Sequence, residues 1–329
     1  MRLALSCLLL AGLIAPAVAQ SGAPFAKGAD VGWLSEMESK GVTFSDANGQ
    51  TGDLLQILKS EGINSIRLRV WVNPKDGWCG KDDVVKMATR AKAMGFRIML
   101  DFHYSDSWAD PQHQPMPAGW KDHDFTQLQK DVYAHTFEVV SALKAAGVTP
   151  EWVQVGNEIT YGMMWPVGKT PNMANLVALI NQGYNAVKAV DPAIKVVIHL
   201  NNGADNSMYR KWFDAALKDG VHFDVIGMSF YPEIKDCTFM SDRCIENMHK
   251  LVAAYGKPVM ICEIGFYEKE PEITQKLLVK IIKGTESVPD HMGLGIFYWE
   301  PEGYTEHYNR CAWQPDGRPS PAMAAFATP

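Results

Sequence analysis

Apolar segments rich in β-branched and aromatic residues alternate along the chain with segments in which apolar residues recur at helical spacing. The alternation repeats at intervals of roughly 25 to 50 residues, which predicts parallel strands joined by crossover helices. The predicted strands are Gly28–Trp33, Ser65–Val70, Arg97–Phe102, Trp152–Gly156, Lys195–Leu200, Asp224–Ser229, Val259–Ile261 and Leu294–Trp299. The predicted helices include Gly52–Glu61, Lys81–Met94, Phe125–Ala146, Asn172–Val190, Ser207–Lys218, Ile245–Tyr255 and Ile273–Lys283.

Eight strand–helix steps follow one another, and no linker rich in Pro, Gly or Ser separates them. This pattern predicts an α/β fold, a single-domain (β/α)8 TIM barrel that occupies residues 20–329. A doubly wound open sheet is the rival fold. That fold usually has a Gly-rich phosphate-binding turn after its first strand, and the sequence shows none there.

The first residues are typical of a secretory signal peptide. Arg2 supplies positive charge, residues 3–14 form an apolar run, and Ala17-Val-Ala19 matches a cleavage signal. We therefore expect residues 1–19 to be removed and the protein to be secreted or periplasmic. The apolar run is too short to span a bilayer, and no later stretch is long enough to do so.

The formal net charge is −6 at pH 7, and the charges are spread without blocks of one sign. This distribution argues against nucleic acid or an anionic membrane as a partner. Hydrophobic residues make up 47% of the chain and charged residues 21%, as in an ordinary globular protein, and we expect a monomer.

Of the six cysteines, Cys7 lies in the expected signal peptide, and five remain after cleavage. No two of them form a C-x2-C pair, so a structural zinc site is not expected. Cys237 and Cys244 flank a short polar stretch and are the best disulfide candidates in an oxidising compartment. Because the remaining number is odd, at least one thiol stays unpaired, and we expect it to be Cys262.

Two glutamates follow predicted strands directly. The fourth strand runs into Asn157 and Glu158, and the seventh ends at Glu263. In a barrel of parallel strands the active site lies where the strands end, so both carboxyls are expected to face the same mouth. Glycoside hydrolysis needs such a pair, because one carboxyl protonates the leaving oxygen while the other attacks or activates water. Either glutamate taken alone has a simpler interpretation as a solvated loop carboxylate.

Supporting polar groups stand at the other strand ends. Arg67 and Arg69 alternate along the second strand, so both face the same side. An inward arginine near the mouth holds a nucleophilic carboxylate ionised, or it forms a structural ion pair inside the barrel. Our hypothesis is that Arg69 holds Glu263 ionised in this way. His103 is a candidate for hydrogen bonds to sugar hydroxyls or to the surroundings of the nucleophile. Asp101 either takes part in the site or caps a loop.

Further candidates follow the fifth and sixth strands, where Asn202 and Tyr231 stand, and Tyr231 is placed to donate its hydroxyl to Glu263. Several tryptophans follow strands rather than helices, and such rings are suited to stacking on the apolar faces of sugars. Each of them alone also has a core-packing interpretation. They are Trp71, Trp108, Trp165 and Trp299.

Other chemistries lack their signatures. Metal-dependent barrel hydrolases gather His and Asp at strand ends, whereas His103 and His199 stand alone on separate strands. A serine nucleophile would need a G-x-S-x-G turn, which is missing. We therefore expect neither a metal ion nor a cofactor.

Four sequence blocks resemble glycoside hydrolase family 53, the endo-β-1,4-galactanases of clan A. The resemblance covers almost the whole chain after the signal peptide. Its most specific blocks are Ile66-Arg-Leu-Arg-Val-Trp-Val-Asn-Pro74, Asp101-Phe-His-Tyr-Ser-Asp-Ser-Trp-Ala-Asp-Pro111, Gln154-Val-Gly-Asn-Glu-Ile159 and Phe297-Tyr-Trp-Glu-Pro301.

The resemblance implies a (β/α)8 catalytic domain and a retaining mechanism, with Glu158 as acid/base and Glu263 as nucleophile. It also implies that Asn157 binds the 2-hydroxyl of the sugar at the cleavage point. Positions that match the family's surrounding polar and stacking residues are Arg69, His103, Tyr231 and Trp299. The implied partner is a polysaccharide, the β-1,4-galactan or type I arabinogalactan side chain of pectin.

The chain departs from the family pattern in three places. Ile264 stands where members often have threonine, and Asn201 stands where an aspartate is usual. The segment 267–272 is short and mixed in charge, so the calcium ion of some bacterial relatives is not carried over. Two other functions stay open: another clan A endo-glycanase, such as a β-mannanase or β-glucanase, and a non-catalytic polysaccharide-binding protein.

Overall fold

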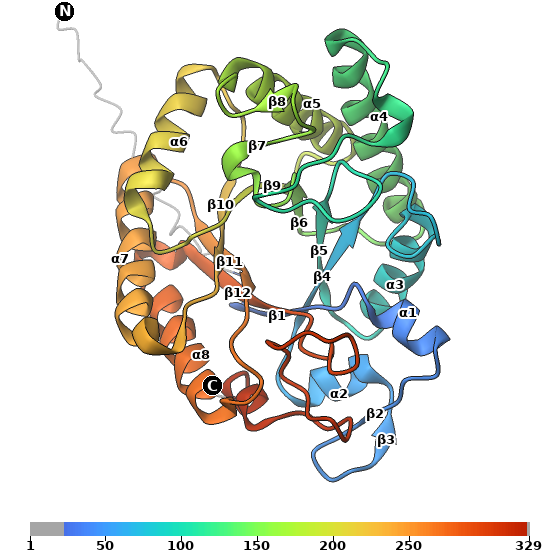
Figure 1. Cartoon of the computed structure of the whole chain (residues 1–329), viewed down its shortest axis with the longest axis vertical. Helices are drawn as coiled ribbons and strands as arrows, with labels where there is room; N and C mark the ends of the chain where they lie inside the picture. Colours follow the sequence, from blue (N-terminus) through green and yellow to red (C-terminus); the bar gives the residue numbers. More distant parts are fainter. Residues whose placement is uncertain (1–22, 328–329) are drawn as a thin grey trace, which may run out of the picture.

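The computed structural model describes residues 23–327, and within them eight parallel strands close into a barrel (Figure 1). The strands are β1 (Ala26–Asp30), β4 (Ser65–Val70), β5 (Arg97–Phe102), β6 (Trp152–Val155), β9 (Lys195–Leu200), β10 (Val225–Phe230), β11 (Val259–Ile264) and β12 (Gly293–Trp299). They neighbour each other in chain order, and β12 pairs with β1 to close the ring. This confirms the predicted (β/α)8 fold class.

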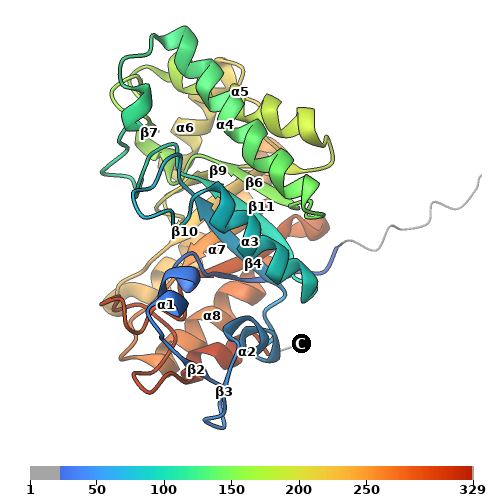
Figure 2. The same cartoon turned by 90° about the vertical axis from the view of Figure 1, so that its right-hand side faces the viewer.

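Helices surround the barrel, and Figure 2 shows α3 and α4 side by side on its outer surface. The helices are α1 (Leu34–Ser39), α2 (Leu54–Ser60), α3 (Lys81–Ala93), α4 (Phe125–Ala145), α5 (Met173–Val190), α6 (Asn206–Lys218), α7 (Cys237–Tyr255) and α8 (Pro271–Glu286). Two short hairpins lie in the loops: β2 (Phe44–Ser45) with β3 (Thr51–Gly52), and β7 (Gly162–Met163) with β8 (Gly168–Lys169). No helix within residues 23–327 is long and apolar enough to cross a membrane.

The interior of the barrel is apolar at one end of the strands and polar at the other. Met99 and Trp152 belong to an apolar cluster, and Phe297 joins them from β12. Two residues further along the same strands stand Asp101 and Gln154, both fully buried. Because alternate side chains of a strand face the same side, these polar groups also point into the barrel. The sequence thus builds its polar layer directly beneath the mouth where the strands end.

The expected disulfide between Cys237 and Cys244 is wrong, because both residues lie in α7 and both are free thiols. The predicted helix began only at Ile245, but α7 begins two turns earlier, at Cys237. Seven residues of helix separate the two Cα atoms by about 10 Å along the axis, whereas a disulfide needs them within about 7 Å. Cys262 is a buried free thiol, as expected. The predicted signal peptide, residues 1–19, lies outside the described residues.

Candidate active site

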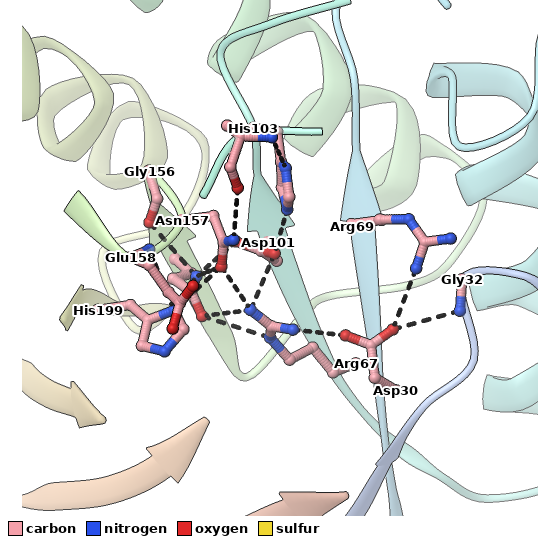
Figure 3. Close-up of polar contacts among 12 residues, drawn as sticks. Asp30, Gly32, Arg67, Arg69, Asp101, His103, Gly156, Asn157, Glu158 and His199 are labelled. Carbon is pink, nitrogen blue, oxygen red and sulfur yellow. Dashed lines mark hydrogen bonds and ion pairs between the residues drawn. The ribbon is translucent and has the colours of Figure 1, made fainter. Parts of the chain in front are cut away.

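A sharp turn at the end of β6 places two polar residues at the mouth of the barrel. Gly156 has a φ of +86°, and a Cβ atom there would lie 2.6 Å from Ile159, so only glycine fits. Glu158, two residues later, adopts a left-handed φ of 46°. Such a backbone is uncommon for a residue other than glycine and is concentrated at functional sites. Figure 3 shows Gly156, Asn157 and Glu158 together at this end of the strand.

Asn157 is held in one orientation by its neighbours. Its side-chain Nδ2 donates to the carbonyl of Ala109 at 2.8 Å, and its Oδ1 accepts from Arg67 at 3.1 Å. Gln114 donates to the main-chain carbonyl of Asn157 at 2.8 Å. These contacts come from β4 and from the loop after β5, so the side chain is fixed before any ligand arrives.

Glu263 lies near the end of β11 and is only 5% exposed. One of its oxygens, Oε1, is 2.8 Å from the guanidinium of Arg67. The other, Oε2, accepts a hydrogen bond from the hydroxyl of Tyr231 at 3.0 Å. Both contacts favour the negatively charged form of the carboxyl.

Arg67 is the centre of the polar layer and is completely buried (Figure 3). Besides Glu263, its guanidinium contacts Asp30 and lies 2.9 Å from Asp101. Gln154 accepts from two of its nitrogens, at 3.1 and 3.3 Å. A buried cation is stable only when it is paired and hydrogen-bonded, and Arg67 meets that condition with groups from the four strands β1, β5, β6 and β11.

Asp101 and His103 form a pair beneath the mouth. His103 Nε2 and Asp101 Oδ2 are 2.8 Å apart, and His103 Nδ1 accepts from the amide of Ala109 at 3.0 Å. Because Nδ1 is an acceptor, Nε2 carries the proton that it donates to Asp101. Burial raises the pKa of Asp101, but the charge of Arg67 and the hydrogen bond from His103 outweigh it, so the pKa lies below its ordinary value. Asp101 is therefore an ionised support for the layer.

Burial raises the pKa of Glu158 to about 7 and that of Glu263 to about 8. The negative charge of Glu158 also raises the pKa of Glu263, which favours one shared proton on the pair near neutral pH. The two values lie close together, so the direct contacts decide which carboxyl carries the charge. Arg67 and Tyr231 contact Glu263, whereas Glu158 forms no ion pair within residues 23–327.

Two cavities meet at Glu158 and Tyr231. The first, of about 340 Å³, holds both carboxyls and is lined by His103, Trp108, Ala109, Asp110, Asn157, Glu158, Tyr231, Glu263, Trp299, Tyr308 and Arg310. The second, of about 390 Å³, is lined by Glu158, Tyr231 and residues of the loops after β9 and β10, but not by Glu263. Together the two cavities place carboxyl and amide groups beside aromatic rings, a combination that suits the binding of sugars.

The aromatic wall of the first cavity is a packed group of rings. Trp299 lies 5.0 Å from Trp33 and 4.7 Å from Tyr308, and Trp108 lies 5.8 Å from Trp299, measured between ring centroids. Rings held this way present a rigid apolar surface at little cost in conformational entropy.

Comparison with known proteins shows the family to which the chain belongs. Residues 26–326 match the model of glycosyl hydrolase family 53. The chain belongs to glycosyl hydrolase family 53. It is therefore a glycoside hydrolase.

The chain is also similar to single proteins of known sequence or structure, and these similarities are consistent with the family. An arabinogalactan endo-β-1,4-galactanase of Thermothelomyces thermophilus is 36% identical over 298 residues, 82% of this chain and 88% of the relative. A solved fungal β-1,4-galactanase has a TM-score of 0.84 at 31% identity, covering 91% of this chain and 98% of that one. A family 53 catalytic domain of Ignisphaera aggregans also has a TM-score of 0.84, at 30% identity, covering 93% and 97%.

Most of the residues that the sequence singled out in this family 53 protein lie at the two cavities. Asn202 lines the second cavity, with a left-handed φ of 52°. The others line the first cavity or contact a residue that does, and they are Asp101, His103, Trp108, Asn157, Glu158, Tyr231, Glu263 and Trp299.

Arg69 does not have the predicted position beside the nucleophile. It pairs with Glu300 and lies 3.8 Å from Asp30, while its guanidinium sits 4.3 Å from the ring centre of Trp108. Arg67, two residues earlier, makes the contact with Glu263. Both arginines face inward, but Arg69 lies one layer nearer the mouth, where it supports the aromatic wall.

Trp71 and Trp165 line neither cavity. Trp71 packs behind the wall, with its ring centroid 5.3 Å from that of Trp108. Trp165 donates its indole N–H to the carbonyl of Tyr161 at 3.0 Å, and the ammonium of Lys169 lies over its ring. Trp71 therefore supports the aromatic wall from behind. Trp165 is half-buried outside both cavities, and its contact with a sugar stays a prediction.

Gln154, Tyr308 and Arg310 are among the residues of the site that escaped the sequence analysis. Gln154 was visible as a polar residue at an inward position of an otherwise apolar strand. Tyr308 and Arg310 come from the irregular loop after β12, where no periodic pattern marks them. Among the described residues, no group of three or more His, Cys, Asp or Glu is placed to hold a metal ion.

Proposed function

We propose that this protein is a secreted, retaining endo-β-1,4-galactanase that hydrolyses β-1,4-galactan and type I arabinogalactan side chains of pectin. Glu263 is the nucleophile and Glu158 the acid/base. One observation carries the assignment: two carboxyls share a cavity, Glu158 half-buried and Glu263 buried. Of the two, only Glu263 contacts the guanidinium of Arg67 and the hydroxyl of Tyr231.

The substrate is supported by the relatives. Chains named arabinogalactan endo-β-1,4-galactanase in Thermothelomyces thermophilus and Humicola insolens are 36% and 35% identical to this one, and each aligns with more than four-fifths of it. The solved fungal β-1,4-galactanase covers 91% of the chain. Other endo-glycanases such as mannanases and β-glucanases remain the alternatives to exclude by assay.

In the first half-reaction, the sugar to be cleaved lies in the first cavity against Trp299. Glu263, ionised beside Arg67, attacks the anomeric carbon, and Glu158 gives its proton to the departing oxygen. Burial keeps the pKa of Glu158 at about 7, which suits a proton donor near neutral pH. A galactosyl ester on Glu263 results.

In the second half-reaction, the ester has removed the negative charge of Glu263. The pKa of Glu158 then falls, because a neighbouring anion no longer raises it. Glu158 takes a proton from water, and the water oxygen attacks the anomeric carbon and displaces the carboxylate of Glu263. The sugar leaves with its original anomeric configuration, and both carboxyls return to their starting states. Asn157 lines the same cavity, and its Nδ2, which already donates one hydrogen bond to Ala109, has a second hydrogen for the sugar 2-hydroxyl.

Secretion rests on the amino-terminal sequence alone. Cleavage after Ala19 would leave a chain that begins at Gln20. Expression of the full chain in a host with a general secretion pathway, followed by mass measurement of the exported protein, tests this. An intact 329-residue chain retained in the cells would contradict it.

Digestion of β-1,4-galactan, with mannan and β-glucan as comparison substrates, tests the activity and the substrate together. We expect galacto-oligosaccharides from galactan alone, and early NMR spectra should show the β-anomer as the first product. Glu158→Gln and Glu263→Gln should each lower the rate by at least about a thousandfold. Glu151→Gln is the matched control, because Glu151 lies at the opposite end of β6, paired with Arg97 at 2.6 Å. An α-anomer as first product would overturn the retaining mechanism.

A further inference from the structure

The second cavity lies on the leaving-group side of the cleft. A sugar bound at the cleavage point must contact both carboxyls, so it occupies the first cavity, which contains them both. The leaving sugar remains beside the proton donor but moves away from the nucleophile. The second cavity has this arrangement, because Glu158 lines it and Glu263 does not. This argument rests on the roles given to the two glutamates under the proposed function.

The walls of the second cavity combine amide side chains with one arginine. Asn201 and Asn202 follow β9, and Met240 and Arg243 lie on the first turns of α7. In Figure 1 this helix, drawn in orange, lies beside α6. The volume of about 390 Å³ is sufficient for at least one sugar ring.

Arg243 has no charged partner of its own. Within residues 23–327 its guanidinium makes no ion pair and no hydrogen bond. It lies 5.9 Å from the ring centre of Phe239, and it adds to the effect of Lys250 in lowering the pKa of Glu246. The acidic residues close to it on α7 are already paired: Asp242 with Lys280 at 2.7 Å, and Glu246 with Lys250 at 2.6 Å.

Asp205, the remaining carboxylate on the loop side of this cavity, is also engaged. Its Oδ1 accepts from the amide of Met208 and caps the first turn of α6. The cavity therefore offers a cation that is free to bind an anion, next to amides that suit sugar hydroxyls. A neutral galactan chain has hydroxyls but no anion for this arginine.

We propose that the second cavity is the leaving-group subsite and that Arg243 there binds the carboxylate of a uronic acid residue on the reducing side of the scissile bond. The protein then cleaves galactan most efficiently close to the point where the chain is attached to an acidic backbone. An exposed ion pair with a flexible arginine is worth little, which corresponds to a preference of about three- to fivefold.

A pair of synthetic substrates tests this: a β-1,4-galacto-oligosaccharide that ends in galacturonic acid at its reducing end, and the methyl ester of the same compound. The two differ only in charge. We expect kcat/KM for release of the terminal residue to be about three- to fivefold higher for the acid. Because the pair is exposed, the preference should shrink as salt is raised.

Variants test whether Arg243 causes the preference for the acid over the ester. Arg243→Gln should abolish it and Arg243→Lys should retain most of it, while cleavage of the ester changes little. Arg210→Gln is the matched control, since Arg210 is an exposed arginine on α6 and lines neither cavity. Thermal melting checks that each variant is folded.

Other outcomes distinguish a failure of the role given to Arg243 from a failure of the proposed galactanase activity. Equal rates on acid and ester, a preference for the ester, or an equal loss on both in Arg243→Gln would overturn the role of Arg243 while leaving the galactanase intact. Failure to cleave even neutral galactan would overturn the proposed function, and this inference with it.

Discussion

The hydrogen bond from Tyr231 to Glu263 is the contact in the site that can be removed most cleanly. The hydroxyl donates to Oε2 at 3.0 Å, and the Tyr231 ring packs against the turn at Gly265, where an added Cβ atom would lie 3.0 Å from it. Tyr231→Phe keeps that ring and its packing but removes the donor. The change therefore isolates one interaction of the proposed nucleophile.

The size of the effect follows from the negative charge of the acceptor, the Glu263 carboxylate. A hydrogen bond to an ionised group contributes about 1.5–3 kcal/mol, and one pKa unit corresponds to about 1.36 kcal/mol. Loss of the bond should raise the pKa of Glu263 by about one to two units. Because Glu263 must be ionised to attack, we expect kcat/KM at neutral pH to fall about ten- to a hundredfold and the acidic limb of the pH profile to move to higher pH.

The assay is kcat/KM on β-1,4-galactan as a function of pH. Tyr255→Phe is the matched control, because Tyr255 donates to Asp214 at 2.7 Å on the outer surface and touches neither cavity. The control should leave both rate and pH profile unchanged. A Tyr231→Phe variant with the wild-type rate and an unmoved acidic limb would refute the argument that this hydroxyl holds the nucleophile ionised.

Three further predictions follow from buried groups. Arg67→Lys should move the acidic limb upward, whereas Arg69→Lys should leave it in place, because only Arg67 touches the proposed nucleophile; equal shifts would contradict this. Burial and a neighbouring glutamate raise the pKa of Glu302 well above 4.5, so stability from this group is complete at low pH and is lost as pH rises. The melting temperature of Glu302→Gln should therefore fall less between acidic and alkaline buffers than that of the wild type, and an equal fall would contradict the argument. Thiol titration of the unreduced, denatured protein should find Cys237 and Cys244 both free, and a melting temperature lowered by reductant would show otherwise.

The strands and the two glutamates could be predicted because they depend on local patterns. Ser65–Val70, Arg97–Phe102 and Lys195–Leu200 have the predicted bounds, since strands buried on both faces are nearly continuous apolar runs. Glu158 and Glu263 were found because position at a strand end decides which residues face the mouth.

Depth inside the barrel could not be predicted. Arg67 and Arg69 share a face, and which of them meets Glu263 depends on the register between strands that are distant in sequence. The pairing of β10 with β11 even shifts at Met228, just before the site. A single strand's alternation gives the side that a residue faces and leaves its height in the barrel undetermined.

Residues in irregular segments also could not be predicted from the sequence. Tyr308 and Arg310 reach the first cavity from a loop whose path is set by tertiary packing. The start of α7 was also missed, although Cys237, Met240 and Cys244 have the i, i+3, i+7 spacing of a helix face, because the polar residues between them resemble those of a loop. That omission made a disulfide within one helix look plausible.

The central claim is that Glu263 is the nucleophile of a retaining galactanase, and covalent trapping tests it most directly. A 2-deoxy-2-fluoro-galactoside with a good leaving group forms the glycosyl ester quickly but hydrolyses it slowly, so the labelled peptide can be identified by mass spectrometry. The account predicts one fluorogalactosyl group per protein, attached to Glu263. A label on Glu158, or release of the leaving group with no covalent adduct, would contradict it.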